Sequence, residues 1–129
     1  MPILDHENFQ GYLGGLVASV GASTDTMGNF TVPAPVDADE PPIVANARFP
    51  FVINEAFAFM AVGSVNYSIR INGVAVTGLS VVAATTGTQA TQRAATALNV
   101  VAAGDIVSVL FAGGVTPTNF ALTLGITRT

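Results

Sequence analysis

The clearest pattern along the chain is a strict alternation of apolar and polar residues over positions 65–71. A period of two residues is typical of a strand with one buried face. The pair Asn72-Gly73 follows directly, and both residues tolerate the positive φ angles that a type I′ hairpin turn requires. A turn at this pair places Ile71 opposite Val74, which joins two apolar side chains. The sequence therefore predicts a β-hairpin here.

From residue 47 onward, short apolar runs alternate with turn residues, a spacing that favours an all-β sandwich or barrel. Leu79 breaks the alternation that follows the hairpin, so a bulge or turn is predicted near Gly78. Gly104-Asp105 can be a tight hairpin turn, which would pair Val100 with Val109. The predicted strands are 47–53, 56–62, 65–71, 74–82, 88–92, 96–102, 106–112 and 120–127.

The first third of the chain differs from the rest, because it contains six of the eight acidic residues before position 49. Apolar residues over 5–20 recur at helical spacing, and Asp5 can cap such a helix. Gly11, Gly14 and Gly15 weaken that helix. Two alternatives stay open: the segment lies on the domain's own core, or it is an arm that docks on a neighbouring subunit. The apolar stripe comprises Phe9, Tyr12, Leu13, Leu16, Val17 and Val20.

A proline-rich segment separates this arm from the predicted strands. Residues 27–32 can form a short strand, and residues 33–42 then contain four prolines and three acids. Proline cannot donate a ladder hydrogen bond, so an extended linker is expected. The spacing of the acids does not fit a calcium-binding EF-hand loop, which favours a solvated acidic loop. We predict two parts, an arm and linker over 1–48 and a β-domain over 49–129.

Composition limits the classes of function. Half of the residues are hydrophobic and only 9% are charged, so part of the surface is expected to be covered by another protein. Cysteine is absent, which excludes a thiol nucleophile and a zinc–thiolate site. Lysine is also absent and the net charge is −4, which argues against nucleic-acid binding. Neither a signal peptide nor an apolar run long enough to cross a bilayer is evident, so no membrane contact is expected.

Candidate catalytic groups are few. His6 is the only histidine and has no nucleophile motif near it, so neither a triad nor a histidine metal site is predicted. Glu55 and Asp105 could form a glycosidase pair, but both fall at predicted turns, where solvated carboxylates are the simpler interpretation. Arg70 lies on the polar face of the central strand, where it is either solvated or paired across a subunit contact. We expect no enzyme activity, no cofactor and no metal.

Three motifs together resemble the trimeric jelly roll of the tumour-necrosis-factor and complement-globular-head kind. They are the strand and Asn-Gly turn over 67–78, the apolar strand with Gly-Asp over 98–109, and the closing strand over 120–126. The resemblance covers 49–129. It implies an all-β, two-sheet antiparallel jelly-roll sandwich that follows an N-terminal arm, and a Gly104-Asp105 connection that crosses between sheets instead of forming a hairpin.

The resemblance also implies a function, because such domains serve as decoration (cement) proteins on the heads of tailed bacteriophages. We expect a structural virion protein on the capsid surface, a homotrimer whose partner is the major capsid protein or another virion subunit. The alternatives are a ligand- or receptor-binding tip domain of a phage fibre or surface protein, and a hydrolase on a β-scaffold. The predicted interface residues are Phe9, Tyr12, Leu13, Leu16, Arg70, Phe120, Leu122 and Leu124.

Overall fold

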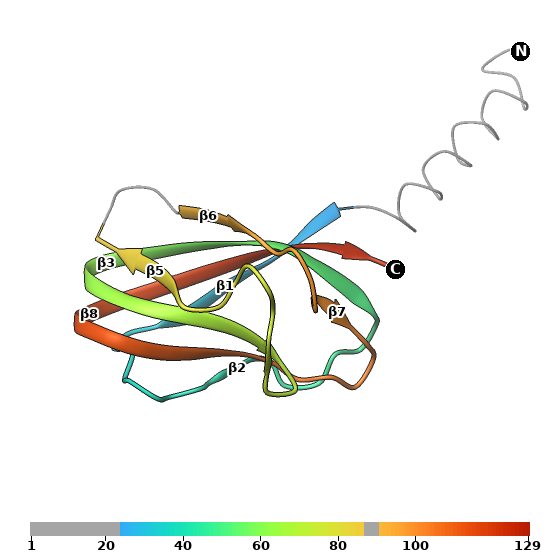
Figure 1. Cartoon of the computed structure of the whole chain (residues 1–129), viewed down its shortest axis with the longest axis horizontal. Coiled ribbons are helices and arrows are strands. Elements are labelled where there is room, and N and C mark those ends of the chain that lie inside the picture. Colours follow the sequence, from blue (N-terminus) through green and yellow to red (C-terminus); the bar gives the residue numbers. More distant parts are fainter. Residues whose placement is uncertain (1–23, 87–90) are drawn as a thin grey trace, which may run out of the picture.

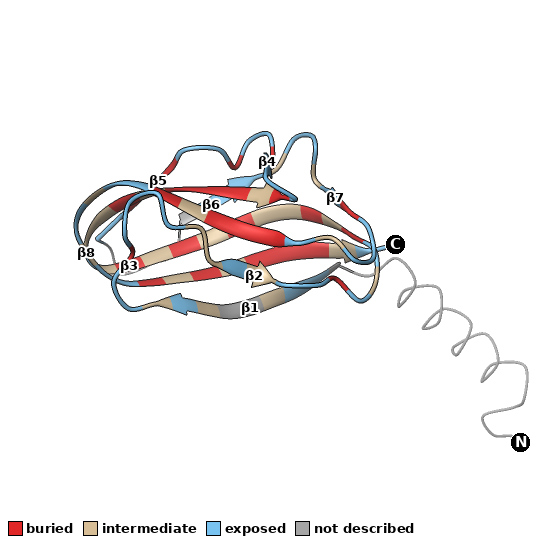
Figure 2. Cartoon of the chain, turned by 90° about the horizontal axis from the view of Figure 1, so that it is seen from below, coloured by how far each residue is buried: buried red, intermediate tan, exposed pale blue. Residues whose placement is uncertain are grey.

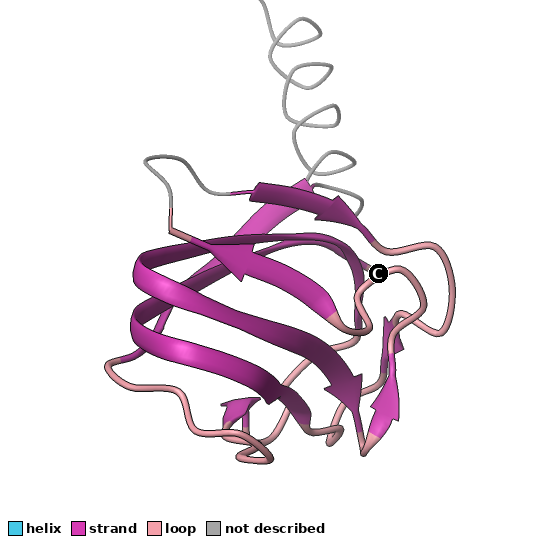
Figure 3. Ribbon diagram, turned by 60° about the vertical axis from the view of Figure 1, so that its left-hand side comes forward, coloured by secondary structure: helices cyan, strands magenta, loops and turns pink. Residues whose placement is uncertain are grey.

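Two long strands dominate the fold. In the computed structural model of the chain, which describes residues 24–86 and 91–129, β3 spans Phe51–Ile71 and β8 spans Val107–Arg128. They run antiparallel and pair from Phe51 opposite Arg128 to Ile71 opposite Val107. Figures 1 and 3 show the two strands curling side by side. We call this pair the β3–β8 ribbon, and every other described strand is attached to it.

The shorter strands extend the ribbon on both sides. Strands β1 (Thr24–Val32) and β2 (Pro42–Val44) pair with β8. On the other side, β3 pairs with β4 (Val74–Ala75), β5 (Val82–Thr85), β6 (Thr91–Ala94) and β7 (Val100–Val101). The result is one curled eight-stranded sheet with antiparallel strand pairs and no helix among the described residues. The predicted all-β class is confirmed, whereas the predicted helix over 5–20 lies outside the described residues.

The curl brings the two halves of the ribbon around one core. Phe120, in the second half of β8, packs edge-on against Phe111 of the first half with 5.0 Å between ring centroids. Tyr67 of β3 lies 5.6 Å from the same Phe120 ring. Buried residues therefore recur in bands along both long strands, as Figure 2 shows. Met60 belongs to this core, as predicted, and Met27 packs against its edge.

The predicted breaks within β3 are wrong, because the chain does not reverse at 54–55 or at 63–64. The register instead shifts between Ile53 and Glu55 and again between Val62 and Ser64. A bulge inserts an extra residue and so changes which positions face inward. The buried positions are accordingly odd, then even, then odd along the strand: Phe51 and Ile53; Ala56, Ala58 and Met60; Val65, Tyr67, Ile69 and Ile71.

Strand β8 likewise joins two predicted strands, 106–112 and 120–127, into one. The ribbon bends where the irregular part of β3 near residue 63 meets the irregular part of β8 near residue 116. Gly63 has a φ of 80°, and a Cβ there would lie 2.3 Å from the carbonyl oxygen of Thr116. Thr116 and Asn119 themselves have φ angles of 43° and 56°. Only glycine fits such a close approach of two backbones. The bend therefore requires a glycine at position 63, although the chain forms no hairpin there.

The predicted Asn72-Gly73 hairpin is confirmed. Ile71 pairs with Val74, and φ is 49° at Asn72 and 81° at Gly73, as a type I′ turn requires. The predicted extension of the second strand to residue 82 is wrong, because β4 ends at Ala75. The chain turns near Gly78, as predicted, and a new strand, β5, then begins.

The connection at Gly104-Asp105 leads from one end of β3 to the other within a single sheet. Val101, before this turn, pairs with Phe51, whereas Val107, after it, pairs with Ile71. These partners are the two ends of β3, so the flanking strands do not pair with each other and the tight hairpin is wrong. The predicted strand 96–102 shortens to β7. Residues 88–90 of another predicted strand lie outside the described part, and β6 begins at Thr91.

The segment before residue 49 contributes strands to the sheet. The predicted strand 27–32 lies within β1, which pairs with β8 along its length. The proline-rich segment follows the first half of β8, where the backbone N–H groups of Phe111 and Val109 donate to the carbonyl oxygens of Asp39 and Pro41. The structure therefore places strands from both predicted parts, 1–48 and 49–129, in one sheet.

Candidate interaction surface

An uncharged patch covers the outer face of the first half of the ribbon. Phe57 and Phe59 alternate with the buried alanines of β3 and are half-buried on the outer side. Phe57 pairs with Thr123 and Phe59 with Ala121, so these four side chains share one face. We call this patch the Phe57 face. Large aromatic side chains on an outer sheet face are the kind of surface that a partner covers.

The margins of the Phe57 face are defined by one acid and one hollow. Glu55 folds over Gly125, where a Cβ would lie 2.7 Å from the Glu55 Cγ. Its carboxylate accepts a hydrogen bond of 2.7 Å from Gln92, so the charge is held at one end of the face. At the other end, Phe59 and Ala121 border a hollow of about 340 Å³ whose further lining is Thr31, Val32, Pro33, Asn119 and Phe120.

Three predicted interface residues, Phe120, Leu122 and Leu124, lie inside the chain's own core, with exposed fractions of 2% or less. Their burial leaves only the alternate side chains of β8, such as Ala121, available for contact with a partner on that strand. The predicted arm residues Phe9, Tyr12, Leu13 and Leu16 lie outside the described residues. The interface role of all these residues stays a prediction.

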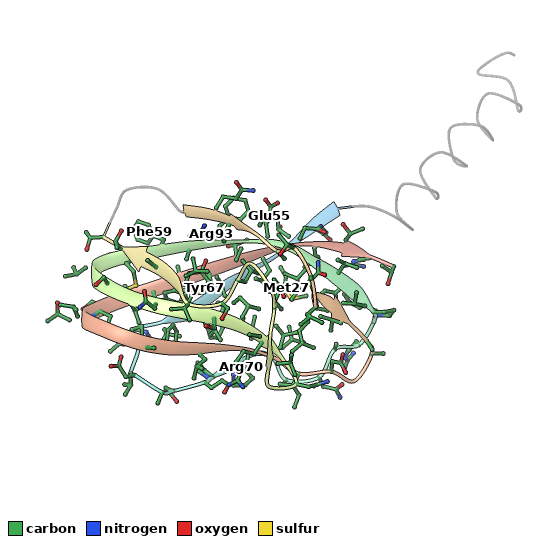
Figure 4. The ribbon with its side chains drawn as sticks, viewed as in Figure 1. Met27, Glu55, Phe59, Tyr67, Arg70 and Arg93 are labelled. Carbon is green, nitrogen blue, oxygen red and sulfur yellow. The ribbon has the colours of Figure 1, made fainter. Side chains whose placement is uncertain are left out.

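Arg70 is tied down within its own chain, which neither interpretation of this residue foresaw. Its guanidinium donates to Glu40 Oε1 at 2.7 Å and to the carbonyl oxygen of Gly73. The second carboxylate oxygen of Glu40 accepts from the Ser108 hydroxyl at 2.7 Å. Figure 4 shows Arg70 on the opposite side of the molecule from Glu55 and Phe59. Glu40 is therefore no plain solvated loop acid, because it bridges β3 and β8 from outside.

A second polar cluster links the two turns at the same end of the ribbon. The Asn72 side chain donates to Asp105 Oδ1 at 2.9 Å and accepts from the backbone N–H of Ile106 at 2.9 Å. The backbone N–H of Ala102, and then the Asn72 amide, lower the pKa of Asp105 below its ordinary value. Asp105 is thus a turn-capping carboxylate that binds Asn72 and Ala102, whereas Glu55, the second carboxylate of the less favoured glycosidase interpretation, binds Gln92.

Tyr67 is an ionisable residue that is buried in the core. Its side chain is 1% exposed, and its hydroxyl makes no hydrogen bond within the described part of the chain. Burial raises the pKa of the phenol to about 12, although the nearby charge of Arg93 lowers it slightly. Figure 4 places Tyr67 in the interior of the molecule. The phenol is therefore neutral and serves packing.

The described residues were compared with the requirements of a metal site and of a membrane-spanning helix. Within residues 24–86 and 91–129, no three His, Asp or Glu side chains gather closely enough to hold a metal ion. The same part of the chain contains no helix of the length and apolarity that crossing a membrane requires. His6 lies outside these residues.

Comparison of the chain with protein-family models, with curated proteins and with solved structures finds no match. The assignment of a function therefore rests on the surfaces described above and on the sequence motifs.

Proposed function

We propose that the chain is a structural virion protein, a jelly-roll decoration (cement) subunit that binds a virus head shell as a homotrimer. The single observation that carries the proposal is the Phe57 face. Two half-buried phenylalanines stand beside Ala121 and Thr123, and the nearest acid is held at the margin by Gln92. A closed symmetric assembly covers such a face without leaving a growing edge.

The composition supports the same proposal. With 9% charged residues, the chain has little charge with which to coat a free monomer. On the opposite outer face, Arg70, one of the four arginines, forms an ion pair with Glu40 of the same chain. A stable trimer interface centred on Phe57 and Phe59 would bury more than about 1,000 Å² of accessible surface. The partner would be the major capsid protein or another virion subunit, as the motif resemblance implies.

The test is the content of purified particles. We expect the chain to be present at a fixed ratio to the main shell protein, measured by quantitative mass spectrometry of density-purified virions. Ala121→Asp places a charge beside Phe59 and should reduce occupancy by at least about tenfold, because it disrupts the trimer. The matched control is Ala112→Asp, the same change at an exposed alanine of the same strand, and it should leave occupancy unchanged. Recovery of the wild-type chain only in particle-free fractions would contradict the proposal.

A further inference from the structure

An apolar hollow lies at the end of the molecule that carries β4 and β7. It has a volume of about 390 Å³ and is lined by Ile71, Val74, Leu98 and Val100. Ile71 is buried, but Val74, Leu98 and Val100 are 56%, 65% and 67% exposed. Val74, Leu98 and Val100 are thus each more than half exposed around one concavity, which is the arrangement of a docking site for apolar side chains.

The loop holds Leu98 in this exposed position. Its φ is 53°, a left-handed conformation that a branched side chain rarely adopts. The residues on both sides are anchored: Asn99 donates to the carbonyl oxygen of Ile53 at 2.6 Å, and Ala97 pairs with Thr77. Because its neighbours hold Leu98 in this position, its side chain is preorganised for contact with a partner segment.

Strand register places the beginning of the described chain on the same side as this hollow. Thr24 pairs with Thr127, Thr127 with Val52, and Val52 with Val100. The backbones of these four residues form one row across the sheet. Three strand-to-strand steps separate Thr24 from Val100, which is about 14 Å. The N-terminal segment therefore starts within a short distance of the hollow.

We propose that the apolar stripe of residues 5–20 docks in this hollow on its own chain. Residues 21–23 can span about 10 Å when extended, and a helix over 5–20 would be about 24 Å long, so the stripe reaches the site. The stripe is aliphatic and aromatic, and the only acids of residues 1–23 are Asp5 and Glu7, near its far end. A tether this short gives an effective concentration near the millimolar range, which favours the chain's own segment over a second copy.

The cysteine-free chain makes cross-linking a direct test. Leu16→Cys in the segment is combined with Val100→Cys beside the hollow, and the purified full-length chain is treated with a short bis-maleimide. The matched control combines Leu16→Cys with Val115→Cys, because Val115 is 63% exposed at the bend of the ribbon, away from β7. We expect an intramolecular cross-link, seen as monomer on a denaturing gel and located by peptide mass spectrometry, for the first pair and at least about tenfold less for the control.

Cross-links between two chains, or equal yields from both pairs, would overturn the proposal.

A second measurement guards against misfolding of the cysteine variants. Leu98→Asp should speed chymotryptic cleavage at Phe9 and Tyr12 by about tenfold, because a carboxylate in the hollow opposes docking. Val36→Asp, at a loop valine that is 62% exposed, should not change the rate. Equal cleavage rates of the wild type, Leu98→Asp and Val36→Asp would also overturn the docking proposal. Neither assay involves particles or the Phe57 face, so this proposal and the proposed function can fail separately.

Discussion

The two halves of the β3–β8 ribbon have the same strand pairing but different outer faces. In the first half, Phe57 and Phe59 face outward and are not covered by any other described strand. In the second half, the outward polar groups are bound within the chain: Ser68 accepts from the backbone N–H of Val81, and Arg70 and Ser108 both bind Glu40. The proline-rich segment thus supplies, through Glu40, hydrogen-bond partners for the outer face of the second half. The outer face of the first half stays available for contact with a partner.

Substitution at the bend between these two halves should cause the largest loss of stability. Gly63→Ala forces a Cβ to within 2.3 Å of two carbonyl oxygens at a positive φ. We expect a loss of at least about 4 kcal/mol in the free energy of unfolding, measured with denaturant, which approaches the whole stability of a small domain. Gly104→Ala is the control, because its φ is also positive but its Cβ would meet nothing within 4 Å. It should cost only about 1–2 kcal/mol.

The polar half can be weakened at Glu40. Glu40→Ala leaves Arg70 and Ser108 without their shared acceptor, and these contacts are only partly exposed to solvent. We expect a loss of about 1 kcal/mol, most of it present at low salt and less at high salt. Asp39→Ala, at the exposed neighbouring acid, should change the free energy of unfolding by less than about 0.5 kcal/mol. Equal losses in the two variants would mean that the bridge contributes nothing.

The smallest expected effect concerns pH and the turn at Asp105. Contacts with Ala102 and Asn72 lower the pKa of this carboxyl in the folded chain below its ordinary value of 3.8. A lowered folded pKa gives a stabilisation that is complete above the unfolded pKa and is lost as the pH falls through the folded pKa. The melting temperature of Asp105→Asn should therefore fall less than that of the wild type between about pH 5 and pH 2.5. Parallel curves would contradict this role.

What the sequence could predict was local. The Asn72-Gly73 turn was predictable because two adjacent residues determine its geometry. The continuity of β3 was not, because a glycine such as Gly63 indicates a positive φ but not whether the chain reverses or only bulges. The Glu40–Arg70 pair spans 30 residues and depends on where the linker runs. The Phe57 face had a signal in the alternation of 56–59, where two alanines occupy the inward positions and two phenylalanines the outward ones.

The central claim is that the Phe57 face is covered by copies of the same chain. Light scattering of the purified wild-type chain measures this most directly, against a chain mass of 13.1 kDa. We predict a monodisperse species of about three times that mass. Ala121→Asp should reduce it to the mass of one chain, and Ala112→Asp should leave it at the trimer mass, because only the first charge lies on the face. A wild-type chain that stays at 13.1 kDa across the micromolar range would contradict the claim.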